Sequence, residues 1–557
     1  GSAKNNNKNV LNAPYIFTKK DGGYGMIAAN SSSASVYLFD SEDLIHFTNE
    51  RTLKVSSGPA VQEPRCSYDE ATDTYLIRWK NGLTQYETVS ADLKTCGETR
   101  EIPYVEEAVP SVNIPEGAVV SQILEVTPQE YQKVLNKLGP VTNTGIEEVK
   151  RTVQEGSSVD VTQLLPETVT LDYSDGSQKE MKVVWEEKDV AEIRTDKPGT
   201  YQVKGTVQQT QYVNPFIEQR ADPCILKGDD GYYYFTASYP MLGDRDENGY
   251  DKVVLRRSKT IEGLKDAEEV TIWDCDDTTG MYRYIWAPEI RLIAGDYYIY
   301  YTASVESWSV WGIRPHVLKC TDPENIMNPA SWEEKGRFQA AAGDTKAFNA
   351  FSLDMTYFEN NGHHYAIWAQ TDECSSLFMA EIDPEEPWKC TSQSIRLSYP
   401  DYSWERVNEN VNEGASVIKR DGKIYIAFSA SGTGPEYTIG LLSADADADL
   451  MDVNSWTKQG YPVLTSADVP GEYGPGHNSF TVDEDGNDIF VYHARSEECY
   501  RDQCNWANQG PLYDPCRDAR LKRVHWAADG TPILKMTYGQ ELAEEFRSIT
   551  AEVTVET

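Results

Sequence analysis

One short pattern occurs five times between residues 231 and 496, and it limits the possible folds more than any other feature of the sequence. Each copy is a turn containing Gly, Asp or Asn followed by a strand of alternating aromatic or aliphatic residues: GYYYFTAS from Gly231, GDYYIYYTAS from Gly295, GHHYAIWAQ from Gly362, GKIYIAFSAS from Gly422 and NDIFVYHAR from Asn487. Subtracting their start positions gives spacings of 64, 67, 60 and 65 residues. This spacing is too long for one hairpin and suits a four-stranded antiparallel sheet. We therefore predict an all-β chain whose main domain, residues 211–548, is a five-bladed β-propeller.

The rest of the chain has weaker but readable patterns. Residues 22–41 and 72–90 resemble the repeat, and TPQEYQKVLNKL has a helix N-cap at Thr127 with Glu130 three residues on. SDGS at 174–177 is typical of a hairpin turn. The predicted segments are a β-rich module with two blade-like units (1–107), a linker with a short helix (108–147) that contains Pro110 and Pro115, a small immunoglobulin-like β-sandwich (148–210) and a short tail (549–557).

The charge balance excludes some partners. The chain has 89 acidic and 51 basic residues and a formal net charge of −38. Because phosphate backbones require clustered Lys and Arg, nucleic acid is not expected as a ligand. No run approaches about 18 apolar residues, so no membrane span is expected. The opening GSAKNNN resembles an expression scar and a polar tether. We therefore expect an extracellular or cell-surface protein whose signal peptide is absent from this sequence.

The ten cysteines are spread over the chain without CxxC spacing, which favours structural thiols, free or locally paired. Cys499, Cys504 and Cys516 share one irregular stretch, where a disulfide that staples a loop is plausible. Only His493 and His525 flank them, at irregular spacing, so a zinc site is the weaker alternative.

Three carboxylates lie among apolar or small neighbours, where burial is costly without a purpose. Asp222 precedes the first repeat, Asp354 lies in FSLDMTYF, and Glu413 lies in VNEGASV. Simple alternation places Asp354 on the face of Ser352 and Thr356. Any one of these carboxylates is readily explained as a turn cap or a surface acid. Three at equivalent places in three repeats predict one shared site on the propeller axis.

Six segments in this order resemble glycoside hydrolase family 43, whose members are five-bladed propellers: RADP (220–223), IWAPEI (285–290), FSLDMTYF (351–358), VNEGASVIKR (411–420), YGPGHNSF (473–480) and YHAR (492–495). The resemblance covers roughly residues 214–540 and is strongest to exo-acting 1,5-α-L-arabinofuranosidases. It implies that Asp222 is the general base, Glu413 the general acid, and Asp354 the residue that orients Glu413 and raises its pKa. Inversion needs such a base and acid about 6.5–9.5 Å apart, with room for a water.

Several neighbours are candidates for substrate binding. Arg495 is either a donor to sugar hydroxyls or a salt-bridge partner of Asp222 or Glu413. Trp286, Trp404 and Phe351 either stack on a sugar or belong to the core. The resemblance makes His477 an axial histidine that holds a structural Ca²⁺ through water, and the alternative is a histidine bonded only to water. Calcium prefers oxygen ligands, and no cofactor is required for the reaction.

The leading hypothesis is an inverting, exo-acting α-L-arabinofuranosidase that trims arabinose from a plant cell-wall polysaccharide or oligosaccharide. A β-xylosidase or an arabinofuranosidase that debranches arabinoxylan is the nearest alternative, since pentoses present similar hydroxyl groups. A non-catalytic carbohydrate-binding propeller is a different class of protein. The three carboxylates argue against it, because binding alone does not need a paired acid and base.

Overall fold

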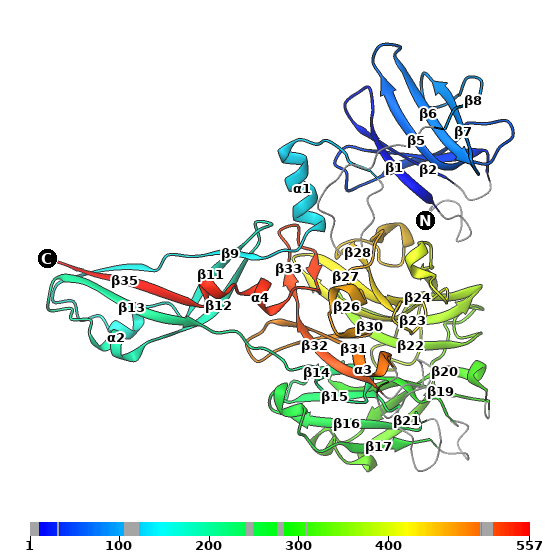
Figure 1. Cartoon of the computed structure of the whole chain (residues 1–557). Helices are drawn as coiled ribbons and strands as arrows, with labels where there is room; N and C mark the ends of the chain where they lie inside the picture. Colours follow the sequence, from blue (N-terminus) through cyan, green and yellow to red (C-terminus); the bar gives the residue numbers. More distant parts are fainter. Residues whose placement is uncertain are drawn as a thin grey trace. The chain divides into compact units, whose positions relative to one another are not determined.

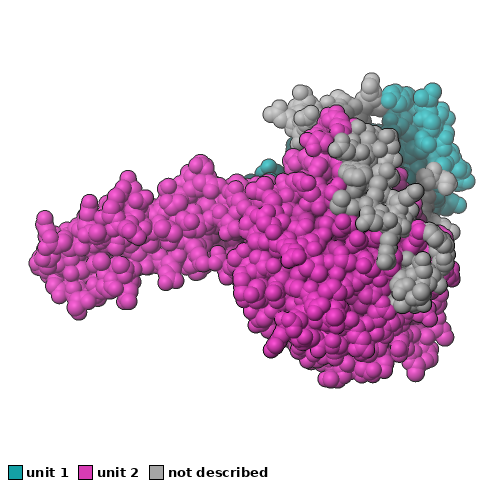
Figure 2. Space-filling model, turned by 90° about the horizontal axis from the view of Figure 1, so that it is seen from below, with its two compact units in different colours: residues 1–140, 401–403 teal, residues 141–400, 404–557 magenta. Residues whose placement is uncertain are grey.

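The computed structural model describes residues 11–29, 33–104, 122–240, 249–275, 283–306, 309–501, 503 and 516–557. These residues form two compact units, 1–140 with 401–403, and 141–400 with 404–557 (Figure 2). Cys504, Pro110 and Pro115 lie outside the described ranges. Among the helices within those ranges, none has the length and apolar character needed to cross a membrane.

The first unit contains two antiparallel sheets of four strands, each a simple meander. The strands are β1 (Asn12–Thr18), β2 (Tyr24–Ala29), β3 (Ser35–Ser41) and β4 (Thr48–Lys54), then β5 (Gln62–Asp69), β6 (Thr74–Asn81), β7 (Thr84–Ser90) and β8 (Arg100–Ile102). Their core includes Ile27, Leu38 and Trp79. Helix α1 (Pro128–Leu138) follows, with the predicted capping box between Thr127 and Glu130. The helix prediction is therefore confirmed.

Five consecutive antiparallel sheets make up most of the second unit (Figure 1). They comprise β14 (Ala221–Lys227), β15 (Tyr233–Ser238), β16 (Lys252–Ser258) and β17 (Val270–Asp274); β18 (Trp286–Ile293), β19 (Asp296–Ser304), β20 (Ile313–Cys320) and β21 (Trp332–Arg337); β22 (Ser352–Asn360), β23 (His363–Asp372), β24 (Cys374–Glu381) and β25 (Ile395–Ser398); β26 (Asn412–Arg420), β27 (Lys423–Ala430), β28 (Thr438–Asp445) and β29 (Thr457–Lys458); and β30 (Glu472–Val482), β31 (Asp488–Ser496) and β32 (Arg517–Arg523). The five sequence repeats form the second strand of each sheet. The first strands of successive sheets lie beside one another, and β14 also contacts β30 of the last sheet.

The first strand of every one of these sheets carries a bulge at the same place. Its pairing with the second strand shifts register there, and one residue in each bulge has a left-handed backbone. These residues, with their φ angles, are Asp222 (52°), Ala287 (46°), Asp354 (55°), Gly414 (55°) and His477 (40°). Such bulges re-aim side chains and are common beside active sites. Simple alternation along β22 therefore fails at Asp354, and the bulge sets the direction of its side chain.

The first unit repeats this local geometry. Pairing shifts between Asn12 and Tyr15 in β1 and between Gln62 and Arg65 in β5. Ala13 and Glu63 have φ angles of 47° within these bulges. The two sheets of this unit thus share the bulged first strand of the five larger sheets.

A six-stranded sheet combines strands from the beginning and from the end of the second unit. Its strand order is β10-β35-β13-β12-β11-β9. Its elements are β9 (Asn143–Ile146), β10 (Lys150–Gln154), β11 (Thr168–Tyr173), β12 (Gln178–Trp185), helix α2 (Glu187–Ala191), β13 (Gly199–Val207) and β35 (Ser548–Glu556). The predicted tail at 549–557 is wrong, because β35 pairs with β13 on one side and β10 on the other (Figure 1). The predicted linker also ends too late, since β9 already belongs to this sheet.

The five sheets are therefore inserted between two neighbouring strands, β13 and β35. Short elements complete the return to β35: α3 (Glu497–Tyr500), β33 (His525–Trp526), β34 (Pro532–Ile533) and α4 (Tyr538–Glu541). Glu541 accepts a hydrogen bond from the Gln209 side-chain amide at 2.7 Å. It also forms an ion pair with Arg523 at 3.1 Å. Lys179 of β12 also pairs with Glu541. Because these groups are largely buried, they connect the six-stranded sheet firmly to the last of the five sheets.

Candidate active site

Asp222 lies at the bulge of β14 and is buried among donors. The Ser238 hydroxyl donates to its Oδ2 at 2.5 Å, and Ser238 Oγ in turn accepts the Ala287 N–H at 2.8 Å. Asp222 Oδ1 lies 3.3 Å from His477 Nδ1 and 3.5 Å from Arg517 Nη1. Burial opposes ionisation, but the positive charges of His477 and Arg517 outweigh it and hold the pKa of Asp222 well below its usual range. Asp222 is therefore a carboxylate at neutral pH.

His477 joins Asp222 to Asp354 at the centre of the site. Its Nδ1 lies 3.6 Å from Asp354 Oδ2, and its backbone N–H donates to Ser429 Oγ at 2.7 Å. Burial lowers the pKa of His477, and the neighbouring carboxylates, Asp222 first, more than restore it, so the net shift is upward. A Cβ at Gly414 would lie 3.1 Å from the His477 ring, at a φ of +55°. Glycine is thus required where β26 passes the imidazole.

Glu413 and Asp354 form a pair linked through the next residue of β26. The Gly414 N–H donates to Asp354 Oδ2 at 3.0 Å, and the Tyr437 hydroxyl donates to Glu413 Oε1 at 2.7 Å. Burial, and then the charge of Asp354, raise the pKa of Glu413 to about 7. Burial raises the pKa of Asp354 to about 6, against the opposing charge of His477. The site therefore combines one fully ionised carboxylate with one that holds a proton near neutral pH.

Arg517, at the start of β32, lies beside Asp222, and the sequence analysis did not single it out. Arg517 Nη2 also donates to the Tyr250 hydroxyl at 2.5 Å. Arg495 is its partner in the β31–β32 pairing and donates from Nη2 to the Cys499 carbonyl at 3.3 Å. Arg517 is therefore a guanidinium that pairs with the base candidate.

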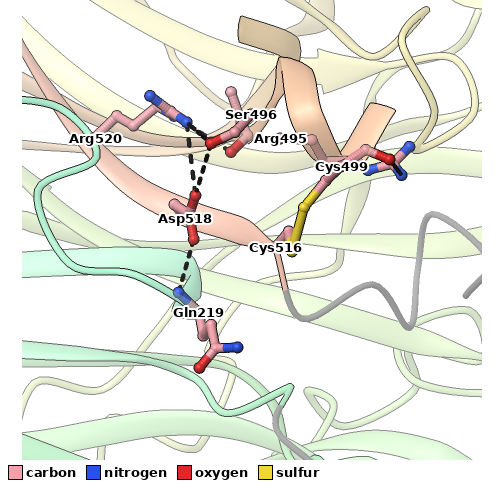
Figure 3. The surroundings of a disulfide bond; sticks show 8 residues. Gln219, Arg495, Ser496, Cys499, Cys516, Asp518 and Arg520 are labelled. Carbon is pink, nitrogen blue, oxygen red and sulfur yellow. Dashed lines mark hydrogen bonds and ion pairs between the residues drawn. A yellow bond between two sulfur atoms is a disulfide. The ribbon is translucent and has the colours of Figure 1, made fainter. Parts of the chain in front are cut away.

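A disulfide between Cys499 and Cys516 fixes the start of β32 next to Arg517 (Figure 3). It joins α3 to β32, as the sequence suggested for two of three clustered cysteines. Two residues further on, Asp518 accepts the Gln219 N–H at 2.8 Å and the Ser496 hydroxyl at 3.2 Å. The strand that carries Arg517 is therefore tied to the segment that leads into Asp222.

The three predicted aromatic contacts differ in their surroundings. Trp286 is 6% exposed and meets Tyr250 and Tyr284 edge-to-face at 6.0 and 5.5 Å. Trp404 packs on the core and donates its indole N–H to the Gly460 carbonyl at 3.0 Å. Phe351 is partly buried directly before β22. Phe351 and Trp404 are both partly buried and pack against the same core cluster, and Phe351 directly precedes β22, the strand that carries Asp354.

Sequence reasoning missed four groups of the site. Ser238 ends the first repeat, Tyr437 begins β28, and His493 lies within YHAR, where its Nδ1 accepts the Asp222 N–H at 3.0 Å. Burial lowers the pKa of His493 to about 4, so its ring is neutral. Arg517 lies outside every motif of the sequence analysis, and it reaches the site through the pairing of β32 with β31.

The site offers little to a directly bound metal. Searched over the described ranges, the chain contains no group of three or more His, Cys, Asp or Glu side chains arranged to hold an ion. The side chain of His477 presents nitrogen, which calcium does not prefer. Direct coordination of calcium by His477 therefore does not fit these residues.

A buried pair of carboxylates with opposite protonation, set where five antiparallel sheets meet, is the arrangement of a hydrolase that acts on glycosides by acid–base catalysis. Residues 212–532 match the family described as glycosyl hydrolases family 43, and residues 146–210 match the bacterial Ig-like domain, group 4. The chain belongs to glycosyl hydrolase family 43.

Three similar proteins support the assignment of the chain to this family. The extracellular exo-alpha-(1->5)-L-arabinofuranosidase of Streptomyces avermitilis is 44% identical over 58% of this chain and 62% of its own length. A protein of the same name from Streptomyces chartreusis is 44% identical over 51% of this chain and 82% of its own length. The crystal structure of an α-L-arabinofuranosidase from Lactobacillus brevis, 37% identical, has a TM-score of 0.52 over 59% of this chain and 98% of that one. The chain thus spans less than two thirds of the Streptomyces avermitilis relative.

Proposed function

We propose that this chain is an inverting, exo-acting α-L-arabinofuranosidase that releases terminal arabinofuranose from 1,5-linked arabinan or arabino-oligosaccharides. The observation that carries the proposal is the burial of Asp222, Asp354 and Glu413 in one cluster, in which His477 lies beside Asp222 and Asp354 and the Gly414 N–H joins Asp354 to the strand of Glu413. The names of the relatives supply the sugar and the exo mode of action.

In the proposed mechanism, Asp222 accepts a proton from a water molecule as that water attacks the anomeric carbon. Glu413 donates its proton to the glycosidic oxygen as the bond from that oxygen to the anomeric carbon breaks. Asp354 keeps Glu413 protonated through its negative charge and orients it through the Gly414 N–H. Arg517 and His477 stabilise the ionised form of Asp222, and Tyr437 fixes the Glu413 carboxyl. Each proton thus starts and ends on a named group.

The proposal also covers the arrangement of the sheets, the binding partner and the location of the protein. The five sheets are read as the blades of a five-bladed propeller, and the six-stranded sheet as a curled immunoglobulin-like sandwich. The partner is an arabinose-containing plant cell-wall polysaccharide, with no role for nucleic acid. An extracellular or cell-surface location is supported by the disulfide, which persists in oxidising compartments, and by the relatives named extracellular.

A structural calcium near His477, held through water, remains part of the proposal. Elemental analysis after dialysis tests it directly. We expect one calcium per chain and a lower melting temperature after chelation. A fully active, equally stable chain without calcium would remove the ion from the scheme.

Product analysis on linear 1,5-arabinan tests the activity. We expect free arabinose alone, released first as the β-anomer in a proton NMR time course, because inversion changes the α configuration. A ladder of oligomers, or the α-anomer first, would contradict exo action or inversion. Faster hydrolysis of aryl-xylosides than of aryl-arabinofuranosides would favour the β-xylosidase alternative. Glu413→Gln and Asp222→Asn should each lose about 10²–10⁴ in rate while keeping the circular dichroism spectrum of the wild type.

A further inference from the structure

Trp311 is a strongly exposed aromatic residue that the proposed chemistry does not use. Its side chain is 69% exposed, and it is the only tryptophan among the exposed large hydrophobic residues of the described chain. An indole of this size is normally buried, since it contributes much apolar surface. Single exposed hydrophobic residues are common, so the position of Trp311 must decide whether it has a function.

Strand pairing places Trp311 at the same end of the sheets as the carboxylates. It lies in the 3-10 turn Val310–Gly312 that joins β19 to β20. Ser304 pairs with Ile313 across this connection, and Thr302 pairs with Trp286 at the start of β18. The next residue, Ala287, donates its N–H to the hydroxyl that holds Asp222. The turn is therefore on the rim around the carboxylates.

A second aromatic residue connects Trp311 to the third sheet. The rings of Trp311 and Phe351 meet edge-to-face at 5.8 Å between centroids. Phe351 lies three residues before Asp354, which at about 3.3 Å per residue keeps it within about 10 Å of that carboxylate along the strand. Trp311 and Phe351 form a pair that we call the rim platform.

The rim platform is held in place before any ligand arrives. Arg314 Nη1 donates to the Trp311 carbonyl at 3.1 Å, and Arg314 Nε donates to the Phe348 carbonyl at 3.0 Å. A Cβ at Gly312 would lie 2.7 Å from Ser304 Oγ and 2.9 Å from the Glu306 nitrogen, so the turn is tightly packed there. The backbone is fixed while the indole stays open to solvent. A pre-organised aromatic surface loses little entropy on binding.

We propose that the rim platform is a subsite for a neutral sugar residue on the leaving-group side of the scissile bond. This inference rests on the proposed function, in which the terminal arabinose binds at the carboxylates and the rest of the sugar chain extends over the rim. The C–H face of a furanose is apolar and suits an indole, and no charged group of the ligand is required. Binding energy from such remote sugar residues favours longer substrates over short ones.

Kinetics on two substrates of different length test the subsite. The ratio of kcat/KM on 1,5-arabinotetraose to that on methyl α-L-arabinofuranoside should fall about five- to tenfold in Trp311→Ala, mostly through KM. Trp311→Phe keeps an aromatic face and should keep most of the ratio. Val453→Ala, an exposed position in the turn between β28 and β29, is the matched control and should leave the ratio unchanged.

Two results would overturn the subsite. An unchanged ratio in Trp311→Ala, or a fall of equal size in Trp311→Phe, would show that no sugar stacks on this surface. Wild-type protein that releases no arabinose from either substrate would refute the proposed function itself, which separates the two failures. Binding of arabinotetraose to Glu413→Gln, measured by calorimetry with and without Trp311→Ala, gives a second readout that does not depend on turnover. Equal affinities in that pair would also count against the subsite.

Discussion

Replacing Asp354 by Asn separates the charge of this residue from its hydrogen bond. Asn keeps an oxygen to accept the Gly414 N–H but removes the negative charge that, together with the larger effect of burial, raises the pKa of Glu413 to about 7. A neighbouring charge changes a pKa by about 1–3 units. If the pKa of Glu413 falls by about one unit, its protonated fraction at pH 7 drops from about a half to about a tenth. We therefore expect about a fivefold loss of kcat/KM at pH 7.

The size of this loss of activity depends on pH. The general acid must be protonated, so activity falls as pH rises through the pKa of Glu413, and the variant should lose activity at lower pH than the wild type. Because the pKa of Asp354 is itself about 6, the wild type also lacks this charge at pH 5, and there the two proteins should differ little. The assay is a kcat/KM profile from pH 4.5 to 9 on an aryl α-L-arabinofuranoside.

A matched control uses a second buried aspartate. Burial raises the pKa of Asp518 to about 6, and its side chain contacts Gln219, Ser496 and Arg520. Asp518→Asn should leave the alkaline limb of the profile in place. A uniform loss at all pH values in Asp354→Asn, with no movement of that limb, would refute the electrostatic role and leave only an orienting one.

Three further outcomes follow from the structure. Tyr437→Phe removes a hydrogen bond that favours ionised Glu413, so the alkaline limb should move to higher pH; a limb that stays or moves down would contradict this role. Cys499→Ser opens a disulfide across 17 residues and should cost about 3 kcal/mol of stability, measured by denaturant unfolding, whereas an unchanged midpoint would show that the bond is not needed. Val553→Ala in β35 removes fully buried methyl groups and should cost about 2 kcal/mol, against a few tenths for the exposed Thr550→Ala; similar costs for both would argue against a central place for β35.

Local repetition explains why much of the fold could be predicted from the sequence. The aromatic alternation of the repeats marks β15, β19, β23, β27 and β31, because period-two patterning and turn residues both act over a few positions. The same spacing singled out Asp222, Asp354 and Glu413, which the structure brings together around His477. Their roles stay predictions until the variants are measured.

The missed features depend on contacts between distant parts of the chain. β35 pairs with β13 across more than 300 residues, and nothing local distinguishes it from an exposed tail. Arg517 reaches Asp222 only because β32 pairs with β31 and a disulfide fixes its start. The left-handed backbone of the five bulges was not expected either, since four of these five residues are not glycine and their sequence alone does not identify such a conformation.

The place of β35 also decides how the molecule carries mechanical load. A pull that enters the chain beyond Glu556 must first strip β35 from β13 and β10, so two rows of backbone hydrogen bonds take the strain together. A load applied between the two ends of the second unit therefore passes through β10, β13 and β35 and bypasses the five sheets inserted between β13 and β35.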